Sequence, residues 1–89
     1  MRQIVQTRKF KSDYKKIARS GRYNKKDFLA VVELLAQDKI LSYKYRDHPL
    51  AGDWMHYREC HIKPDWLLIY KKTKDTLILV RTGSHCNLF

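Results

Sequence analysis

Hydrophobic positions in the first third of the chain recur at the spacing of an amphipathic helix. Phe10, Tyr14 and Ile17 stand at i, i+4 and i+7, and lysine and arginine fill most of the positions between them. This spacing places the three side chains on one face of a helix. Thr7 is a suitable N-cap, and Gly21 can end the helix in a left-handed conformation. The pattern therefore predicts a basic helix between these two residues.

A second helix is predicted from Asn24, a favourable N-cap, to a point near Asp38. Asp27 in its first turn is favourable beside the helix dipole. Residues 2–6, before the first helix, read as a short strand. The apolar stripe of the second helix consists of Phe28, Val31, Val32 and Leu35.

The periodicity changes from helical to extended in the second half of the chain. Residues 42–54 are polar and rich in turn formers, and Pro64-Asp65 and Lys72–Asp75 read as tight turns. Residues 83–89 form a short final segment that we expect to cap the sheet. Three segments have the character of strands: residues 56–62, 66–71 and 76–82.

The order of these elements predicts an α+β fold, β-α-α-β-β-β, in a single domain over residues 1–89. Strands joined by short turns run antiparallel, so we expect two N-terminal helices packed on a twisted antiparallel sheet. The apolar faces of both helices need a partner, and one sheet face supplies it. The opposite face stays partly open. We expect a functional site on that concave, basic face.

Charge narrows the choice of partners. The 89 residues carry 19 Lys and Arg against 9 Asp and Glu, a net charge of +10. Such a domain suits nucleic acid, an anionic membrane surface or an acidic protein. No apolar run reaches the length of a membrane span, and the N-terminus lacks the apolar segment of a signal peptide. We therefore expect a cytoplasmic protein whose two cysteines remain thiols.

Histidines concentrate in the C-terminal half, near carboxylates and cations. Cleavage of RNA requires a base for the ribose 2′-OH, an acid for the leaving 5′-oxygen and cations for the phosphoryl charge, and it can proceed without metal. Imidazoles suit the first two tasks and arginine the third. Taken singly, however, each histidine is more often a structural residue. The candidates are His48, His61, His85, Asp65 and Glu59, with Lys63, Arg58 and Arg81 as cations.

A zinc site is the main chemical alternative, because His61, His85, Cys60 and Cys86 are acceptable ligand types. Neighbouring residues on a strand point to opposite faces, so Cys60 and His61 cannot share one ion. The spacing therefore argues against zinc, and we predict no metal and no cofactor.

Three motifs in the second half of the chain match a known pattern in order and spacing. Residues 47–54 (DHPLAGDW) match the segment D-H-x-L-x-G-x-W. Residues 57–70 (YRECHIKPDWLLIY) match R-[DE]-x-H-x-x-P-D-x-[IL]-L-[IVL]-Y, and residues 81–89 (RTGSHCNLF) match R-x-G-[ST]-H-x-x-L-F. Together they resemble the motifs of the YafQ-type mRNA interferase toxins in the RelE/ParE superfamily. The N-terminal half agrees in layout and length, with weaker identity.

The resemblance implies a RelE/ParE-like fold and an endoribonuclease that cleaves mRNA in the ribosomal A site. It also implies a DinJ-like antitoxin, through which alone the toxin would contact operator DNA. We assign His85 as general acid, and Asp65 with His48 or His61 as general base. The family's catalytic positions correspond to His48, Glu59, His61, Asp65 and His85. The predicted RNA-binding residues are Arg58, Lys63, Arg81 and Phe89.

Two rival functions remain open at this point. A ParE-like toxin on the same fold would inhibit gyrase by binding protein and would leave transcripts whole, although such relatives generally lack this His/Asp set. A basic RNA-binding module would bind RNA in a salt-dependent manner without cutting it.

Overall fold

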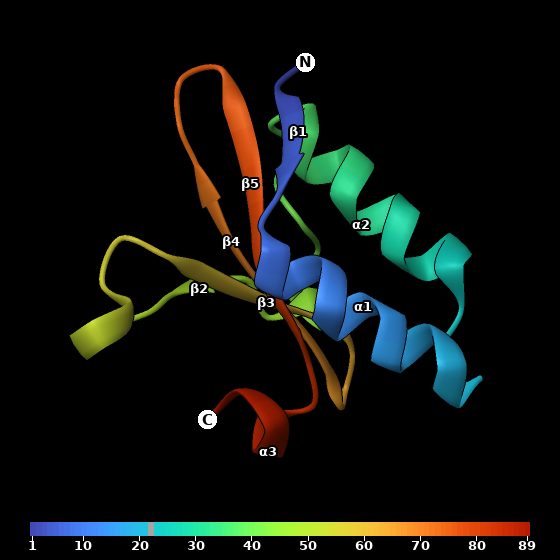
Figure 1. Ribbon diagram of the computed structural model, residues 1–89. Coiled ribbons are helices and arrows are strands. Elements are labelled where there is room, and N and C mark those ends of the chain that lie inside the picture. The colour runs from blue at the N-terminus through green and yellow to red at the C-terminus, as the bar shows by residue number, and fades with distance from the viewer. Residues whose placement is uncertain (22) are drawn as a thin grey trace.

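The computed structural model describes residues 1–21 and 23–89. Two long helices lie beside a twisted sheet, and a short C-terminal helix lies at the end of the sheet opposite the N-terminus (Figure 1). Short 3-10 turns, η1 (Tyr43–Tyr45) and η2 (Gly52–Trp54), flank β2. The helices and strands are β1 (Gln3–Gln6), α1 (Arg8–Ser20), α2 (Lys25–Ala36), β2 (His48–Pro49), β3 (Arg58–Lys63), β4 (Trp66–Lys72), β5 (Thr76–Gly83) and α3 (His85–Leu88).

The five strands lie in the order β1-β5-β4-β3-β2. The predicted α+β fold and the antiparallel pairing of β3, β4 and β5 are confirmed. β1, however, pairs with β5 in parallel, so the sheet is mixed. A parallel pair needs a long crossover, and α1 and α2 lie within the connection from β1 to the rest of the sheet. The two-residue strand β2 extends the other edge, within a segment predicted as a loop.

Both long helices begin and end close to the predicted residues. The Thr7 side chain accepts a hydrogen bond from the Phe10 amide, and Asn24 caps α2 in the same way through Lys26. Gly21 ends α1 at φ +68°, where a side chain would be strained. The buried apolar stripes pack with β3, β4 and β5 into one core that contains Phe10, Ile17, Phe28, Val31, Val32, Leu35, Trp66, Leu68, Tyr70, Leu77 and Leu79.

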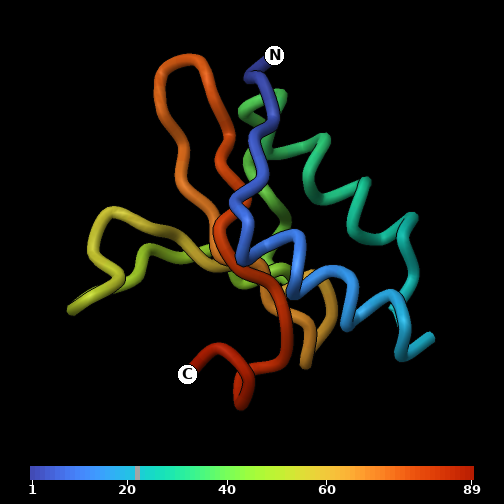
Figure 2. The backbone as a smooth tube through the Cα atoms, in the orientation of Figure 1, coloured from blue at the N-terminus to red at the C-terminus, as the bar shows by residue number. Residues whose placement is uncertain are grey.

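The other face of the sheet is partly covered. Leu67 and Ile69 of β4 are buried there against Leu88 of α3. The chain reaches α3 through Gly83, whose φ of +155° turns the backbone out of β5, and the Ser84 side chain caps the new helix. Figure 2 shows this final segment curling back at the end of the sheet. No helix in the described residues is long and apolar enough to cross a membrane.

Candidate active site

Two imidazoles converge on one buried carboxylate. Nε2 of His48 lies 3.3 Å from Oε1 of Glu59, and Nε2 of His61 lies 3.4 Å from the same oxygen. The Glu59 side chain is 6% exposed, whereas His48 is 48% and His61 19% exposed. The acidic group is therefore sheltered from solvent, and the two rings open outward.

The sheet register produces this convergence. His48 of β2 pairs directly with Glu59 of β3, and Glu59 and His61 share a face because side chains alternate along a strand. Cys60, between them, points into the helix-side core and is fully buried, which raises the pKa of its thiol. The expected separation of Cys60 and His61 is thus confirmed.

Backbone carbonyls fix the orientation of both rings. Nδ1 of His48 lies 3.1 Å from the Pro49 oxygen, and Nδ1 of His61 lies 3.3 Å from the Pro64 oxygen. A carbonyl only accepts, so each Nδ1 carries the hydrogen. Each Nε2 then faces the carboxylate, either as a donor or with a lone pair. The cluster is therefore built to hold a proton or a cation between imidazole and carboxylate.

The same three residues can hold a metal ion. One ligand atom from each of His48, Glu59 and His61 lies within 4.8 Å of the others. Imidazole and carboxylate together suit copper or zinc. The sequence did not suggest this set, because the residues considered as zinc ligands included the two cysteines. Only the pairing of β2 with β3 brings His48 to the site.

His85 lies across a narrow apolar strip from this cluster. Along one row of the sheet, His61 pairs with Leu67 and Leu67 pairs with Gly83, two residues before His85. Two strand spacings separate the ends of that row by about 10 Å. Leu88 anchors α3 on the strip, and His85 stays exposed. An imidazole therefore stands on each side of the Leu67–Ile69 surface.

Phe89 extends the His85 side with aromatic rings. Its ring lies 5.3 Å from that of His85 and 6.3 Å from that of Trp54 in η2. Trp54 in turn meets Tyr57 edge to face. Phe89 is 51% exposed, so part of its ring remains accessible to a base.

Asp65 lies outside the histidine–glutamate cluster. It is exposed in the turn between β3 and β4, where its carbonyl accepts a hydrogen bond from the Tyr23 hydroxyl. It lines a shallow groove with Ser84 and Asn87 of the α3 segment. A base role for Asp65 remains a prediction, whereas Glu59, the least certain candidate in the sequence, lies at the centre of the site.

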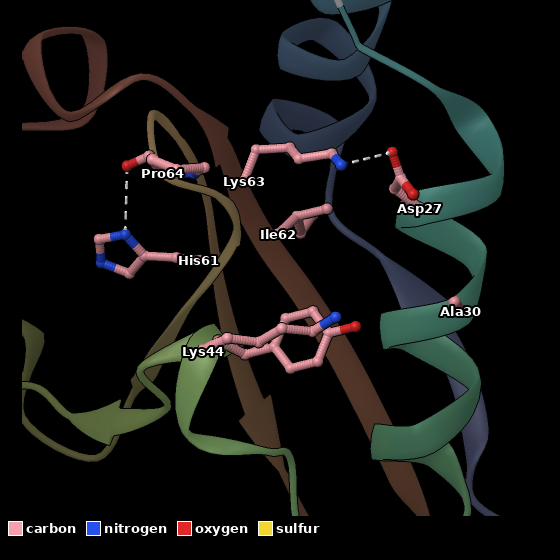
Figure 3. Close-up of a pocket in the computed structure, with 8 residues that line it drawn as sticks. Asp27, Ala30, Lys44, His61, Ile62, Lys63 and Pro64 are labelled. Atoms are coloured by element: carbon pink, nitrogen blue, oxygen red, sulfur yellow. Dashed lines mark hydrogen bonds and ion pairs between the residues drawn. The ribbon is translucent and has the colours of Figure 1, made fainter.

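A bulge in β3 directs Lys63 away from the histidines. The register between β3 and β4 shifts between His61 and Lys63, and such a shift turns the following side chain. Figure 3 shows His61 turned toward the Pro64 carbonyl and Lys63 extending the other way, toward α2. There its Nζ lies 3.2 Å from Oδ2 of Asp27.

Arg58 also lies on the helix side, within a polar network behind the cluster. Its Nε lies 3.3 Å from Oδ1 of Asp47, which also accepts a hydrogen bond from the Tyr70 hydroxyl. Burial and the Asp47 hydrogen bond raise the pKa of Tyr70, which therefore stays a neutral donor. The network therefore fixes Asp47, which precedes His48, and Arg58, which precedes Glu59.

Arg81, the third predicted cation, is clamped by a carboxylate of α1. Its Nε lies 2.6 Å from Oδ2 of Asp13 and its Nη2 lies 3.2 Å from Oδ1. Hydrogen bonding to Asp13 raises the pKa of the guanidinium. The two bonds use two of its five N–H donors. Asp13 is the one acidic residue of the basic helix α1, the only sequence signal for this partner.

Comparison with known proteins identifies the family. A model of the family described as "Bacterial toxin of type II toxin-antitoxin system, YafQ" matches residues 2–89. This chain belongs to the YafQ family. The resemblance expected from the three motifs is thereby confirmed.

Individual YafQ relatives agree in sequence and structure. The mRNA interferase toxin YafQ of Escherichia coli K12 is 56% identical over 45 residues, 51% of this chain and 49% of that protein. The matched stretch thus spans about half the length of this curated relative. A copper-bound mutant toxin from Helicobacter pylori superposes with a TM-score of 0.96 at 37% identity, over 100% of both chains. YafQ in the E. coli DinJ-YafQ complex gives 0.87 at 37%, over 100% of this chain and 99% of that one.

Proposed function

We propose that this YafQ-family chain is a ribosome-dependent endoribonuclease that cleaves mRNA by acid–base catalysis and so inhibits translation. The observation that carries the proposal is the convergence of His48 and His61 on buried Glu59, across the Leu67–Ile69 strip from His85. It supplies proton-accepting and proton-donating groups on opposite sides of the apolar strip, about two strand spacings apart. The name of the E. coli relative, mRNA interferase toxin YafQ, supports cleavage of mRNA.

The reaction needs two proton transfers. The 2′-oxygen attacks the adjacent phosphorus while its proton passes to Nε2 of His48 or His61. The imidazolium that forms already faces Glu59, which stabilises its charge. The bond from phosphorus to the 5′-oxygen breaks, and that oxygen takes a proton from His85. The products are a 2′,3′-cyclic phosphate and a 5′-OH end, and no water is consumed.

Other predicted residues would bind the RNA or the ribosome rather than transfer protons. Arg81 keeps three N–H donors beyond its bonds to Asp13 and can direct them at a phosphoryl oxygen. Phe89 is half-exposed and can stack on a base. The exposed cations of α1 suit the phosphate-lined decoding region of the small ribosomal subunit. They are Arg8, Lys9, Lys11, Lys15, Lys16 and Arg19.

We also propose that this chain acts in the cytoplasm, where a DinJ-like antitoxin inhibits it and carries it to operator DNA. The solved DinJ-YafQ complex of E. coli supports this partnership. With a net charge of +10, the chain favours an acidic covering surface. Their association should weaken as salt rises.

Mapping RNA ends tests the proposed reaction. In a reconstituted translation reaction, the wild-type chain should produce discrete new 5′ ends that carry hydroxyls and accept phosphate from polynucleotide kinase without prior phosphatase treatment. His85→Ala should lower the cleavage rate by about 10²- to 10⁴-fold, because the leaving oxygen loses its acid. Intact transcripts with the wild-type chain would instead favour ParE-like action. Equal cleavage without ribosomes would contradict ribosome dependence.

Copper offers a second test, since the H. pylori relative is copper-bound. Nε2 of both histidines and Oε1 of Glu59 would hold the ion here, and a bound ion would polarise a phosphoryl oxygen. The same ion would occupy the lone pairs that the proposed reaction uses for protons. We therefore expect stoichiometric Cu²⁺ to reduce cleavage by about tenfold or more. A chain that is stripped of metal with EDTA, and then freed of EDTA before Mg²⁺-containing ribosomes are added, should stay fully active. Activation by Cu²⁺, or loss of cleavage after this stripping, would contradict the acid–base proposal.

A further inference from the structure

The turn that precedes β2 displays an aromatic ring and a cation beside the histidine cluster. Tyr43 in η1 is 93% exposed, and neighbouring Ile40 is 98% exposed. Large apolar side chains this exposed on a small domain mark a binding surface when they lie together. Arg46, which ends the turn, is also exposed and has a left-handed backbone, φ +46°.

This turn is held firmly on both sides. The Tyr45 amide donates to Ser42, the Arg46 amide donates to Tyr43, and the Tyr45 ring packs against the main core. After the turn, Tyr70 and Arg58 hold Asp47. Because the backbone of the turn is already fixed, a ligand that stacks on the ring orders only the Tyr43 side chain.

Two cavities share Tyr43 and Arg46 as walls. One, of about 710 Å³, reaches His48 and Arg58. The other, of about 330 Å³, reaches His61 and Pro64. Both volumes lie in the range that accommodates small ligands. The turn therefore borders both histidines of the cluster.

The charge at this turn favours an anion. Arg58, Lys63 and Arg81 each have a carboxylate partner. Within residues 1–21 and 23–89, by contrast, no carboxylate forms an ion pair with Arg46. Lys44 lies beside it, with its ammonium 5.0 Å from the centre of the Tyr45 ring. Arg46 is therefore a cation whose guanidinium is available to a phosphate.

We infer that this turn is a nucleotide subsite for single-stranded RNA, in which a base stacks on Tyr43 and Arg46 binds a phosphate. An exposed aromatic ring beside a cation is the arrangement that binds unpaired bases with little sequence demand. The subsite is distinct from the Phe89 ring, which lies at α3 beyond the apolar strip.

The position of the turn also sets the polarity of the RNA. Under the proposed function, on which this step rests, His48 or His61 accepts the proton of the attacking 2′-OH, and His85 serves the leaving 5′-oxygen. The attacking ribose lies on the 5′ side of the broken bond. η1 contacts β3, whereas α3 contacts β5 on the other side of β4. The subsite therefore holds the nucleotide on the 5′ side of the cleaved bond.

Binding of an inert RNA tests the subsite separately from catalysis. The probe is a six-nucleotide RNA with 2′-O-methyl ribose throughout, titrated to millimolar concentration by NMR against the full chain. Tyr43→Ala should weaken binding about five- to tenfold through lost stacking, and Tyr43→Phe should bind as the wild type does. Arg46→Ala should weaken binding by a similar factor and lower the salt dependence by about one ion. Lys74→Ala, with the same charge change in the β4–β5 turn, is the matched control.

A second probe is the same 2′-O-methyl RNA without one base, that of the nucleotide expected on the 5′ side of the cleaved bond. With this abasic RNA, Tyr43→Ala should change affinity by less than about twofold, because the stacking partner is gone. An equal loss with both probes would overturn the inference, as would absent binding to the wild-type chain. If Tyr43→Ala weakens only the antitoxin complex, the turn is a protein contact and the inference fails. A wild-type chain that binds the probe at Tyr43 but cuts no mRNA would refute the proposed reaction and leave the subsite standing.

Discussion

Glu59→Gln should lower the rate of mRNA cleavage by about two to four orders of magnitude while the chain keeps its fold. The carboxamide has nearly the same shape but no negative charge. Its oxygen can still accept a hydrogen bond, yet it cannot stabilise an imidazolium on both His48 and His61. Single-turnover cleavage on programmed ribosomes measures the effect, and a thermal melt followed by circular dichroism verifies folding.

The chain contains its own control for this substitution. Its other glutamate, Glu33, lies exposed on α2 and accepts a hydrogen bond from Gln37. Glu33→Gln removes the same charge and should cleave within about twofold of the wild-type rate, because surface substitutions away from a site act weakly. If Glu59→Gln cleaved as fast as Glu33→Gln, the buried carboxylate would have no catalytic part.

Trp66→Ala should reduce the free energy of unfolding by about 3–5 kcal/mol, a large share of the total stability of a small domain. Trp66 is 1% exposed and packs against Tyr23 and Phe28. Its indole N–H donates to Thr82 Oγ1 at 2.9 Å, in the buried core. Removal of the ring therefore leaves a cavity and removes a donor from a buried hydroxyl. Urea unfolding followed by circular dichroism measures the loss.

The second tryptophan provides the comparison. Trp54 is half-buried on the opposite face of the sheet, so Trp54→Ala should cost about 1–2 kcal/mol, in proportion to the smaller buried area. We expect cleavage by Trp66→Ala to fall in step with the fraction unfolded. A Trp66→Ala variant with wild-type stability would contradict the core role of this ring.

Local signals in the sequence were sufficient for most of the fold. Thr7, Asn24 and Gly21 mark helix ends because capping depends on neighbouring residues. The pairing of β1 with β5 was not predictable in this way. It joins Gln3 to Thr76, and no local pattern states whether such distant strands run parallel. The strand β2 was missed because two residues carry no periodic signal.

In the candidate site, too, local sequence signals and long-range contacts were not equally predictable. The motifs predicted which residues to examine, but the contacts among them depend on tertiary packing. Glu59 becomes central because β2 places His48 opposite it, and Lys63 turns away because of a bulge. Asp13, 68 residues before Arg81, could not be assigned as its partner from spacing. Tyr43 and Arg46 escaped notice because exposure is a property of the folded chain.

The parallel contact between β1 and β5 has a consequence for synthesis of the chain. β1 is synthesised before its hydrogen-bonding partner, residues 76–79 of β5, so its ladder forms late. His85 comes after β5 and takes its place later still. A nascent polypeptide halted before β5 therefore lacks a complete sheet and its proposed proton donor. The proposed cleavage of mRNA can therefore begin only after residue 85 has been translated.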